Sequence, residues 1–283
     1  METKRLLTGF TVGFAFYFAL LAGGLWFLSI ILVITLLGAK EYTEILSNKG
    51  FLPSLKIMLA SVILFAIVCY NNRADLMPLV FTISAFMSFM WVLFRGRQPY
   101  IANVATTLLG VMYVAWFPMH LLFLRNLGTE VSSGIPYPEG ACYTFMLFIC
   151  VIITDTFCYY FGCKYGKHKL SKVISPNKTI EGAIGGTVMC VIASLIMGLW
   201  IHLAWYHAII LGLLIAVFAQ IGDLCESMIK RDAGVKDSSH ILPGHGGFLD
   251  RVDSYILTIP VMYYYLIYFV QTNVLENLFK GLF

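Results

Sequence analysis

Charged residues are scarce in this chain. Asp, Glu, Lys and Arg make up 12% of its 283 residues, whereas a soluble domain carries roughly a quarter. Hydrophobic residues make up 59%, and the runs 76–94 and 208–221 contain no charged residue at all. The alternative, a soluble protein with buried helices, is disfavoured because so few charged side chains cannot cover an outer surface. The composition therefore indicates a membrane protein.

Cysteine pairs and alternating strands are missing as well. The seven cysteines form no Cys-x-x-Cys pair, so we expect neither a disulfide framework nor a zinc site. The apolar runs do not alternate with polar residues as the strands of a membrane barrel do. Because only helices and closed barrels satisfy their backbone groups in lipid, we expect an all-α integral membrane protein built as a polytopic helical bundle.

The apolar runs are long enough for about nine transmembrane helices. Their expected positions are near 6–22, 23–38, 55–70, 75–94, 100–124, 141–161, 180–200, 206–229 and 254–271. We expect the first two to form a tight hairpin at Ala22-Gly23-Gly24. The alternative is a cleaved signal peptide with Lys4-Arg5 as its basic region. The chain continues directly into another apolar run, which favours the hairpin.

Lys and Arg set the expected topology. With the N-terminus inside and the C-terminus outside, 16 of the 19 basic residues fall in inner segments, leaving only Arg73, Arg125 and Lys280 outside. Such a basic cytoplasmic face attracts anionic lipid headgroups and nucleotide phosphates. The alternative, that these loops only orient the protein, explains the first three inner segments but not the composition of the last two.

The chain divides by composition near residue 140. Residues 1–140 contain the first five spans, an amphipathic stretch at 40–50 and an outer loop, and we expect them to form a membrane scaffold. Residues 141–283 contain the last four spans and the polar cytoplasmic loops, where we expect catalysis. Two small-residue pairs, Gly9 with Gly13 and Gly182 with Gly186, are typical of helices that approach closely.

Two acids interrupt apolar spans at equal depth. Asp155 and Asp223 each lie seven residues before the inner end of their span, which is ~10 Å below the cytoplasmic surface at 1.5 Å per residue. A charge in the bilayer costs ~3 kcal/mol on insertion scales and needs a partner or a function. We expect both carboxylates in one pocket that opens to the cytoplasm. The alternative is two structural acids hydrogen-bonded between helices.

Polar residues follow Asp223 at helical spacing. Glu226, Ser227 and Lys230 share one helical face with it, and Arg231 follows directly. A salt-bridged helix end has a similar pattern, but it does not require the polar loop that comes next.

That loop, residues 232–253, combines glycines with acids and bases. Gly246-Gly247 leaves backbone amides open to a closely bound phosphate, and Asp250 and Asp253 share a face at the head of the last span. Carboxylates beside phosphates are typical of a magnesium site. The expected phosphate donors are Lys236, His245 and Arg251.

The other inner loop ends in Ser175-Pro-Asn-Lys-Thr-Ile-Glu-Gly182. Lys178 and Thr179 are placed to hold a phosphate at the N-terminus of the next helix, and Glu181 lies where the helix dipole favours an anion. A positive-inside loop explains the lysines of 164–172 but not this segment.

These segments resemble the phosphatidate cytidylyltransferase family, also called CDP-diacylglycerol synthase. The family signature is Ser-x-x-Lys-Arg, Lys-Asp, Pro-x-His-Gly-Gly and Asp-Arg-x-Asp, and residues 227–253 match it throughout. Residues 175–182 and 155–162 resemble two further family segments. In the latter, Phe157 and Cys158 replace the usual small residues.

The resemblance implies that CTP and phosphatidic acid react to give CDP-diacylglycerol and pyrophosphate. It implies a multi-pass membrane enzyme. Together with the basic inner segments, we expect it in the bacterial cytoplasmic (inner) membrane with its active site facing the cytoplasm. Mg²⁺ is the implied cofactor, with a second metal ion left open. The implied partners are CTP, phosphatidic acid and membrane lipid, with a homodimer as a further expectation and no nucleic acid.

We assign the candidate residues roles in this reaction. Carboxylates ligate the metal, namely Asp223 and Asp250, with Asp253 beside them. Positive side chains neutralise phosphate charge, namely Lys178, Lys230, Arg231, Lys236 and Arg251. His245 and the amides of Gly246 and Gly247 contact the transferring phosphate, and Asp155 shapes the pocket. The further candidates for binding substrate or phosphate are Ser227, Thr179 and Glu181.

Three other functions remain open at this point. A CTP-dependent lipid kinase would transfer the γ-phosphate, and a sugar-phosphate transferase would act on polyprenyl phosphate. An ion-coupled transporter would use the intramembrane carboxylates Asp155 and Asp223. The concentration of polar groups at one face, without an acidic site toward the outside, disfavours transport.

Overall fold

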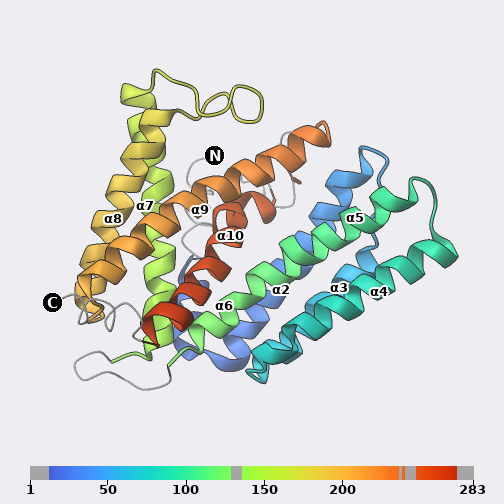
Figure 1. Cartoon of the computed structure of the whole chain (residues 1–283), viewed down its shortest axis with the longest axis horizontal. Coiled ribbons are helices and arrows are strands. Elements are labelled where there is room, and N and C mark those ends of the chain that lie inside the picture. Colours follow the sequence, from blue (N-terminus) through green and yellow to red (C-terminus); the bar gives the residue numbers. More distant parts are fainter. Residues whose placement is uncertain (1–12, 129–135, 236–237, 240–246, 273–283) are drawn as a thin grey trace. The chain divides into compact units, whose positions relative to one another are not determined.

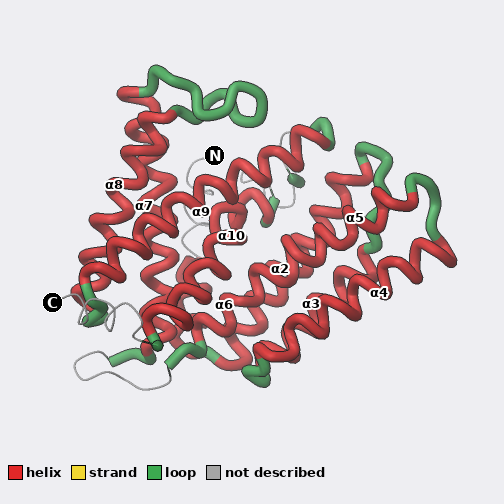
Figure 2. The backbone as a smooth tube through the Cα atoms, in the orientation of Figure 1, coloured by secondary structure: helices red, strands yellow, loops and turns green. Residues whose placement is uncertain are grey.

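A computed structural model describes residues 13–128, 136–235, 238–239 and 247–272. Within these residues the regular structure is helical and contains no strand (Figure 2). The first helix within the described residues, Gly13–Ala22, carries no label. The labelled elements follow in chain order (Figure 1): α2 (Gly24–Ser47), α3 (Leu55–Tyr70), η1 (Ala74–Leu76), α4 (Met77–Arg95), α5 (Tyr100–Gly110), η2 (Val111–Trp116), α6 (Phe117–Arg125), α7 (Glu139–Tyr165), α8 (Ile180–Trp200), α9 (Trp205–Asp232), α10 (Leu249–Tyr265) and η3 (Leu266–Val270).

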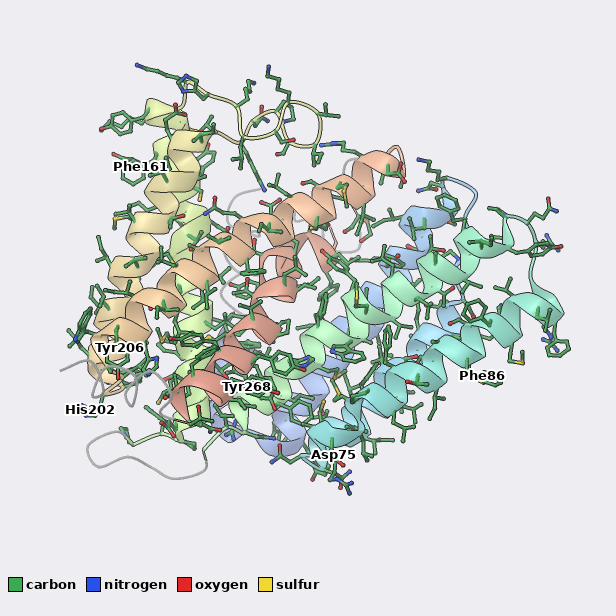
Figure 3. The ribbon with its side chains drawn as sticks, viewed as in Figure 1. Asp75, Phe86, Phe161, His202, Tyr206 and Tyr268 are labelled. Carbon is green, nitrogen blue, oxygen red and sulfur yellow. The ribbon has the colours of Figure 1, made fainter. Side chains whose placement is uncertain are left out.

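Six of the helices in the described part are long and apolar enough to cross a membrane. Their outward side chains are apolar as well. Phe86 on α4, labelled in Figure 3, is 61% exposed, and Phe94 on the same helix is 77% exposed. Large aromatic side chains in such numbers are stable on an outer surface when lipid rather than water surrounds them. Every predicted span contains a helix within the described residues, which agrees with the predicted all-α membrane class.

The chain forms two compact units, each made of two segments. Unit 1 comprises residues 1–127 and 225–253, and unit 2 comprises residues 128–224 and 254–283. This division concerns packing, whereas the division expected near residue 140 concerns roles and stays a prediction.

In unit 1 the first helix and α2 form the expected hairpin. Gly23 alone separates them and has a φ of 63°, in the left-handed region that favours glycine. Phe16 and Phe27 pack across the turn with ring centroids 5.6 Å apart. The Arg125 guanidinium donates to the carbonyls of Leu20 and Leu21 at the end of the first helix. Gly9, of the first small-residue pair, lies outside the described residues.

The helix α2 continues well past the predicted end at residue 38. Residues 40–47, expected as a separate amphipathic stretch, form its last two turns. Tyr42 and Ile45 extend its buried face, and the Tyr42 hydroxyl donates to the carbonyl of Thr106 at 2.9 Å. Lys40 and Glu44 form an exposed ion pair at 3.8 Å on the other side. Packing of the apolar face therefore extends the helix through a stretch whose charges suggested a boundary.

In unit 2 the helices α7 and α8 pack closely through glycine. A Cβ atom on Gly182 would lie 2.6 Å from the carbonyl oxygen of Cys158, and one on Gly186 would lie 2.2 Å from the Cys158 sulfur. The predicted close approach at this small-residue pair is confirmed. The absence of side chains at the two glycines of α8 leaves room for Cys158.

Candidate active site

Unit 2 brings together three of the predicted site residues. The Lys178 ammonium lies 2.6 Å from a carboxylate oxygen of Asp223, and both side chains are partly buried. Asp155, on α7, lies within the electrostatic influence of both Lys178 and Asp223. The Ser254 hydroxyl donates to Asp155 at 3.5 Å. We call these four residues the Lys178 cluster. It places two acids of apolar helices near one base.

The segment that presents Lys178 is held at the start of α8. Thr179 is the N-cap, and its hydroxyl oxygen accepts the amide of Gly182 at 3.2 Å, as Thr commonly does at that position. The Glu181 carboxylate accepts the backbone amides of Lys167 and His168 at 3.0 and 3.2 Å and contacts the His168 ring at 2.6 Å. In this arrangement Thr179 and Glu181 order the basic loop, which fixes the backbone beside Lys178.

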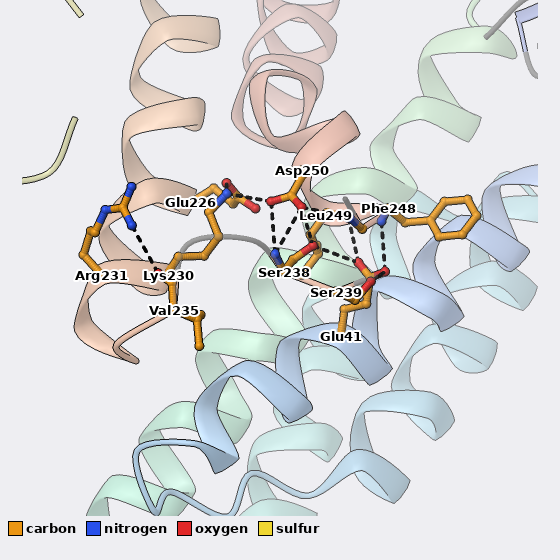
Figure 4. Close-up of polar contacts among 11 residues, drawn as sticks. Glu41, Glu226, Lys230, Arg231, Val235, Ser238, Ser239, Phe248, Leu249 and Asp250 are labelled. Atoms are coloured by element: carbon orange, nitrogen blue, oxygen red, sulfur yellow. Dashed lines mark hydrogen bonds and ion pairs between the residues drawn. The ribbon is translucent and has the colours of Figure 1, made fainter. Parts of the chain in front are cut away.

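In unit 1 one ammonium group lies between two carboxylates. Lys230, in the last turns of α9, lies 2.5 Å from Glu226 and 2.6 Å from Asp250 at the start of α10 (Figure 4). The exposed fractions of the three side chains are 12%, 3% and 14%. Asp253 acts electrostatically on Glu226 as well. Buried charges require partners of this kind because desolvation of a lone charge is costly.

Asp250 accepts several further hydrogen bonds. Its Oδ2 atom accepts from the Ser238 hydroxyl at 2.8 Å, from the Ser238 amide at 3.1 Å and from the Gly247 amide at 2.9 Å. Burial opposes ionisation, but the Gly247 amide and the Lys230 ammonium outweigh it and hold the pKa of the Asp250 carboxyl below its usual range. Asp250 is therefore an ionised carboxylate at the centre of its cluster.

Gly247 fits this arrangement because it has no side chain. A Cβ atom there would lie 2.0 Å from the Ser238 hydroxyl and 2.6 Å from a carboxylate oxygen of Glu41. The sequence predicted an open Gly247 amide that contacts phosphate. In this structure that amide donates to Asp250, so it contributes to the order of the loop.

Glu41 is a site residue that was not predicted from the sequence. This residue of α2 is fully buried, and its carboxylate accepts the amides of Phe248 and Leu249 at 2.9 Å each (Figure 4). The hydroxyl of Ser239 donates to it at 2.7 Å. Because Leu249 is the first residue of α10, Glu41 caps that helix from another part of the chain. A signal was present: Glu41 lies three residues after Gly38 and four before Ile45, on the buried face of α2.

The remaining predicted site residues lie either in α9 and α10 or outside the described part of the chain. Arg231 donates to the carbonyl of Val235 at 3.3 Å, which closes the end of α9. Its neighbour Asp232 forms an ion pair with Lys49. Three residues lie within α9 and α10, namely Ser227, Arg251 and Asp253. Three more lie outside the described residues, namely Lys236, His245 and Gly246.

The donor atoms at both clusters have the chemistry that Mg²⁺ prefers. Asp155 and Asp223 in unit 2, and Glu226 and Asp250 in unit 1, are carboxylates, and hard cations bind such oxygens. Each pair already attracts a positive group, Lys178 or Lys230. No set of three or more His, Cys, Asp or Glu side chains in the described part is arranged to hold a metal ion by protein groups alone. This fits Mg²⁺, which usually takes few protein carboxylates along with water and phosphate.

Comparisons with known proteins identify the family of this chain. Residues 3–269 match the model of the cytidylyltransferase family. A phosphatidate cytidylyltransferase of Synechocystis sp. is 34% identical over 98% of this chain and 100% of its own length. The phosphatidate cytidylyltransferase of Staphylococcus aureus is 36% identical over 91% of this chain and 96% of its own. The chloroplastic phosphatidate cytidylyltransferase 4 of Arabidopsis thaliana is 32% identical over 90% and 71%. The chain therefore belongs to the cytidylyltransferase family.

Proposed function

We propose that this chain is a phosphatidate cytidylyltransferase. An oxygen of the phosphatidic acid phosphate attacks the α-phosphorus of CTP, the bond between the α-phosphorus and the bridging oxygen breaks, and pyrophosphate leaves. The products are CDP-diacylglycerol and pyrophosphate. The names of the relatives support this assignment over nearly the whole chain. The structural observation that carries it is the ion-pair cluster in which Lys230 and Asp250, two residues of the signature segment, lie together with Glu226.

The chemistry that this reaction needs is mainly electrostatic. The lipid phosphate is already a nucleophile, so the barrier lies in bringing anionic phosphates together and stabilising the charge of the leaving group. Lys178 and Lys230 are ammonium groups held in place by carboxylates, so little reorganisation is needed when phosphates arrive. We propose that both contact substrate phosphates, together with Arg231 and Arg251.

We propose Asp223 and Asp250 as ligands of Mg²⁺, with Asp253 beside them. When bound, Mg²⁺ would neutralise phosphate charge and favour departure of pyrophosphate. Within unit 2 Asp223 would then be shared between Mg²⁺ and Lys178, and within unit 1 Asp250 would be shared between Mg²⁺ and Lys230. Asp155 adds negative charge beside Asp223 in unit 2, which favours a divalent cation there.

We also propose the location and topology of the enzyme. A multi-pass arrangement with about nine spans, the N-terminus inside and the C-terminus outside, places 16 of the 19 basic residues on the cytoplasmic side. The active site would then lie on the cytoplasmic side of a bacterial inner membrane, where CTP is present. A homodimer is part of the proposal, and nucleic acid is not a partner.

Labelled CTP tests the reaction directly. Purified protein is incubated with phosphatidic acid and Mg²⁺ and with CTP labelled at either the α- or the γ-phosphate. The proposal expects the α-label and the cytidine in the lipid, the γ-label in pyrophosphate, and a lipid mass equal to CDP-diacylglycerol. Transfer of the γ-label to lipid would instead establish a kinase. Uptake into sealed vesicles without chemical change would establish a transporter.

A further inference from the structure

A cavity of unit 1 lies apart from the residues discussed so far. It has a volume of about 270 Å³ and lies where α3 begins, α4 ends and α5 begins. Arg95, Arg97, Ser54 and Asn103 are among its lining residues, and none of the lining residues is Asp or Glu. We propose that this cavity binds the phosphate group of an anionic phospholipid. The proposal does not depend on the catalytic activity.

The cavity is rich in positive charge that no acid neutralises. Neither Arg95 nor Arg97 forms an ion pair within the described residues, although seven ion pairs occur elsewhere in that part of the chain. Arg95 and Lys56 both lie over the ring of Trp91, 5.7 and 5.8 Å from its centre. A guanidinium group matches the geometry of phosphate oxygens and binds them through paired hydrogen bonds.

A buried hydroxyl adds an independent indication of a ligand. Ser54 lines the cavity and is 7% exposed, and its Oγ atom has no hydrogen-bond partner within the described residues. Its backbone amide donates to Thr107 at 2.9 Å, which fixes its position. Buried polar atoms rarely remain unpaired because desolvation is costly. A phosphate oxygen in the cavity would accept the Ser54 hydroxyl hydrogen.

The two loops around the cavity are held in place before any ligand arrives. Asn103 is buried, its side-chain oxygen accepts the amide of Leu52 at 2.8 Å, and its side-chain nitrogen donates to the carbonyl of Arg97 at 2.7 Å. One side chain therefore joins the loop that carries Ser54 to the loop that carries Arg97. A preformed site of this kind needs little reorganisation on binding.

The apolar surroundings favour a lipid over a free phosphate ion. Leu93, Phe94 and Ile101 are 70%, 77% and 87% exposed beside the arginines. Arg95 ends the apolar helix Ala74–Arg95, so the cavity lies where a spanning helix reaches the level of lipid headgroups. Acyl chains would cover the exposed side chains while the headgroup phosphate enters the cavity.

Native mass spectrometry of the full chain in detergent micelles tests the proposal. The probes are phosphatidylglycerol, which is neither the substrate nor the product of the proposed reaction, phosphatidylcholine, and inorganic phosphate. We expect wild-type protein to retain one phosphatidylglycerol in preference to phosphatidylcholine. The R95Q/R97Q double variant and S54A should each bind it roughly tenfold more weakly or worse, because each removes hydrogen bonds to a charged group.

The matched control is R73Q. Arg73 is exposed in the same unit before α4 and is paired with Asp75 at 2.7 Å, so its loss should leave lipid binding unchanged. Equal phosphatidylglycerol affinity in wild type and both test variants would overturn the proposal. Binding of inorganic phosphate as tight as that of the lipid would overturn the assignment to lipid. If the double variant fails to fold, S54A alone decides, since its hydroxyl has no partner to lose within the described residues.

Discussion

Glu41 accepts the backbone amide of Leu249 at 2.9 Å across 208 residues of sequence. The same carboxylate accepts the amide of Phe248, so an acid of α2 takes the place of a local cap at the start of α10. A carboxylate at a helix N-terminus is favoured both by the free amides and by the helix dipole. Asp250 is the next residue of that helix, so its position depends on an N-terminal helix that looked like scaffold.

Replacement of Glu41 tests this dependence. E41Q removes the charge and one acceptor while it keeps the shape, and we expect a loss of about 1–3 kcal/mol in the free energy of unfolding together with lower turnover. Thermal unfolding in micelles and the cytidylyl transfer assay measure the two effects. The control is E44Q, an exposed acid on the same helix. Equal behaviour of E41Q and E44Q would rule out the role in positioning.

Loss of the Asp250 charge should affect both catalysis and metal dependence. D250N removes the partner of Lys230 and a proposed ligand, and we expect turnover to fall by about 10²–10³-fold with a higher Mg²⁺ requirement. Steady-state rates over a Mg²⁺ titration measure this. D232N, an exposed acid near the end of α9, is the control. Near-normal turnover with a normal Mg²⁺ dependence would reject the proposed metal ligand.

The lowered pKa of Asp250 predicts how its contribution to stability varies with pH. A carboxyl whose pKa is lower in the folded than in the unfolded protein stabilises the fold above the unfolded pKa, about 3.9 for Asp, and loses that contribution as pH falls through the folded pKa. The difference in unfolding temperature between wild type and D250N should therefore stay constant from about pH 5 to about pH 8. A difference that changes steadily within that range would contradict the assignment.

Lys178 should act on phosphate rather than only on the fold. K178M removes the ammonium that lies 2.6 Å from Asp223, and we expect a higher KM for CTP and a turnover at least ~100-fold lower. The control is K172M, an exposed lysine of the same loop. Unchanged kinetics in K178M, with Lys172 equally dispensable, would remove Lys178 from the active site.

Gly247 should tolerate no side chain. G247A would place a methyl group 2.0 Å from the Ser238 hydroxyl, so the loop must shift and Asp250 must lose one or more hydrogen bonds. We expect a loss of about 1–3 kcal/mol and a clear loss of turnover. G13A is a suitable control, because a Cβ atom there has no neighbour within 4 Å among the described residues. Retention of full activity by G247A would show that the loop adapts.

Much of the fold follows from composition. Long apolar runs gave the helices, and the spacing of Glu226 and Lys230 by four residues predicted a shared face where the structure has an ion pair. Gly182 and Gly186 predicted close packing of their helix. The prediction is confirmed because both glycines lie against Cys158 of α7. These features depend on local periodicity, so one sequence is enough to find them.

Other features depend on distant parts of the chain. In the sequence Glu41 is one of three charged residues near the end of α2, with Lys40 and Glu44. Only its hydrogen bonds to residues after 237 distinguish it from the other two. The extension of α2 to Ser47 likewise depends on the burial of Tyr42 and Ile45. The roles of Thr179 and Gly247 within their own loops were also hidden, because a residue that suits a phosphate contact also suits a backbone cap.

The position of Lys230 between Glu226 and Asp250 means that this part of the protein carries its own counterion. Mutual repulsion of the two acids is already balanced by a side chain, so the architecture does not rely on an inorganic ion for its integrity. A chelator should consequently halt turnover while the protein stays folded, and restoring Mg²⁺ should recover the rate without a refolding delay. Activity would thus fall and recover reversibly as the Mg²⁺ concentration changes, without unfolding of the protein.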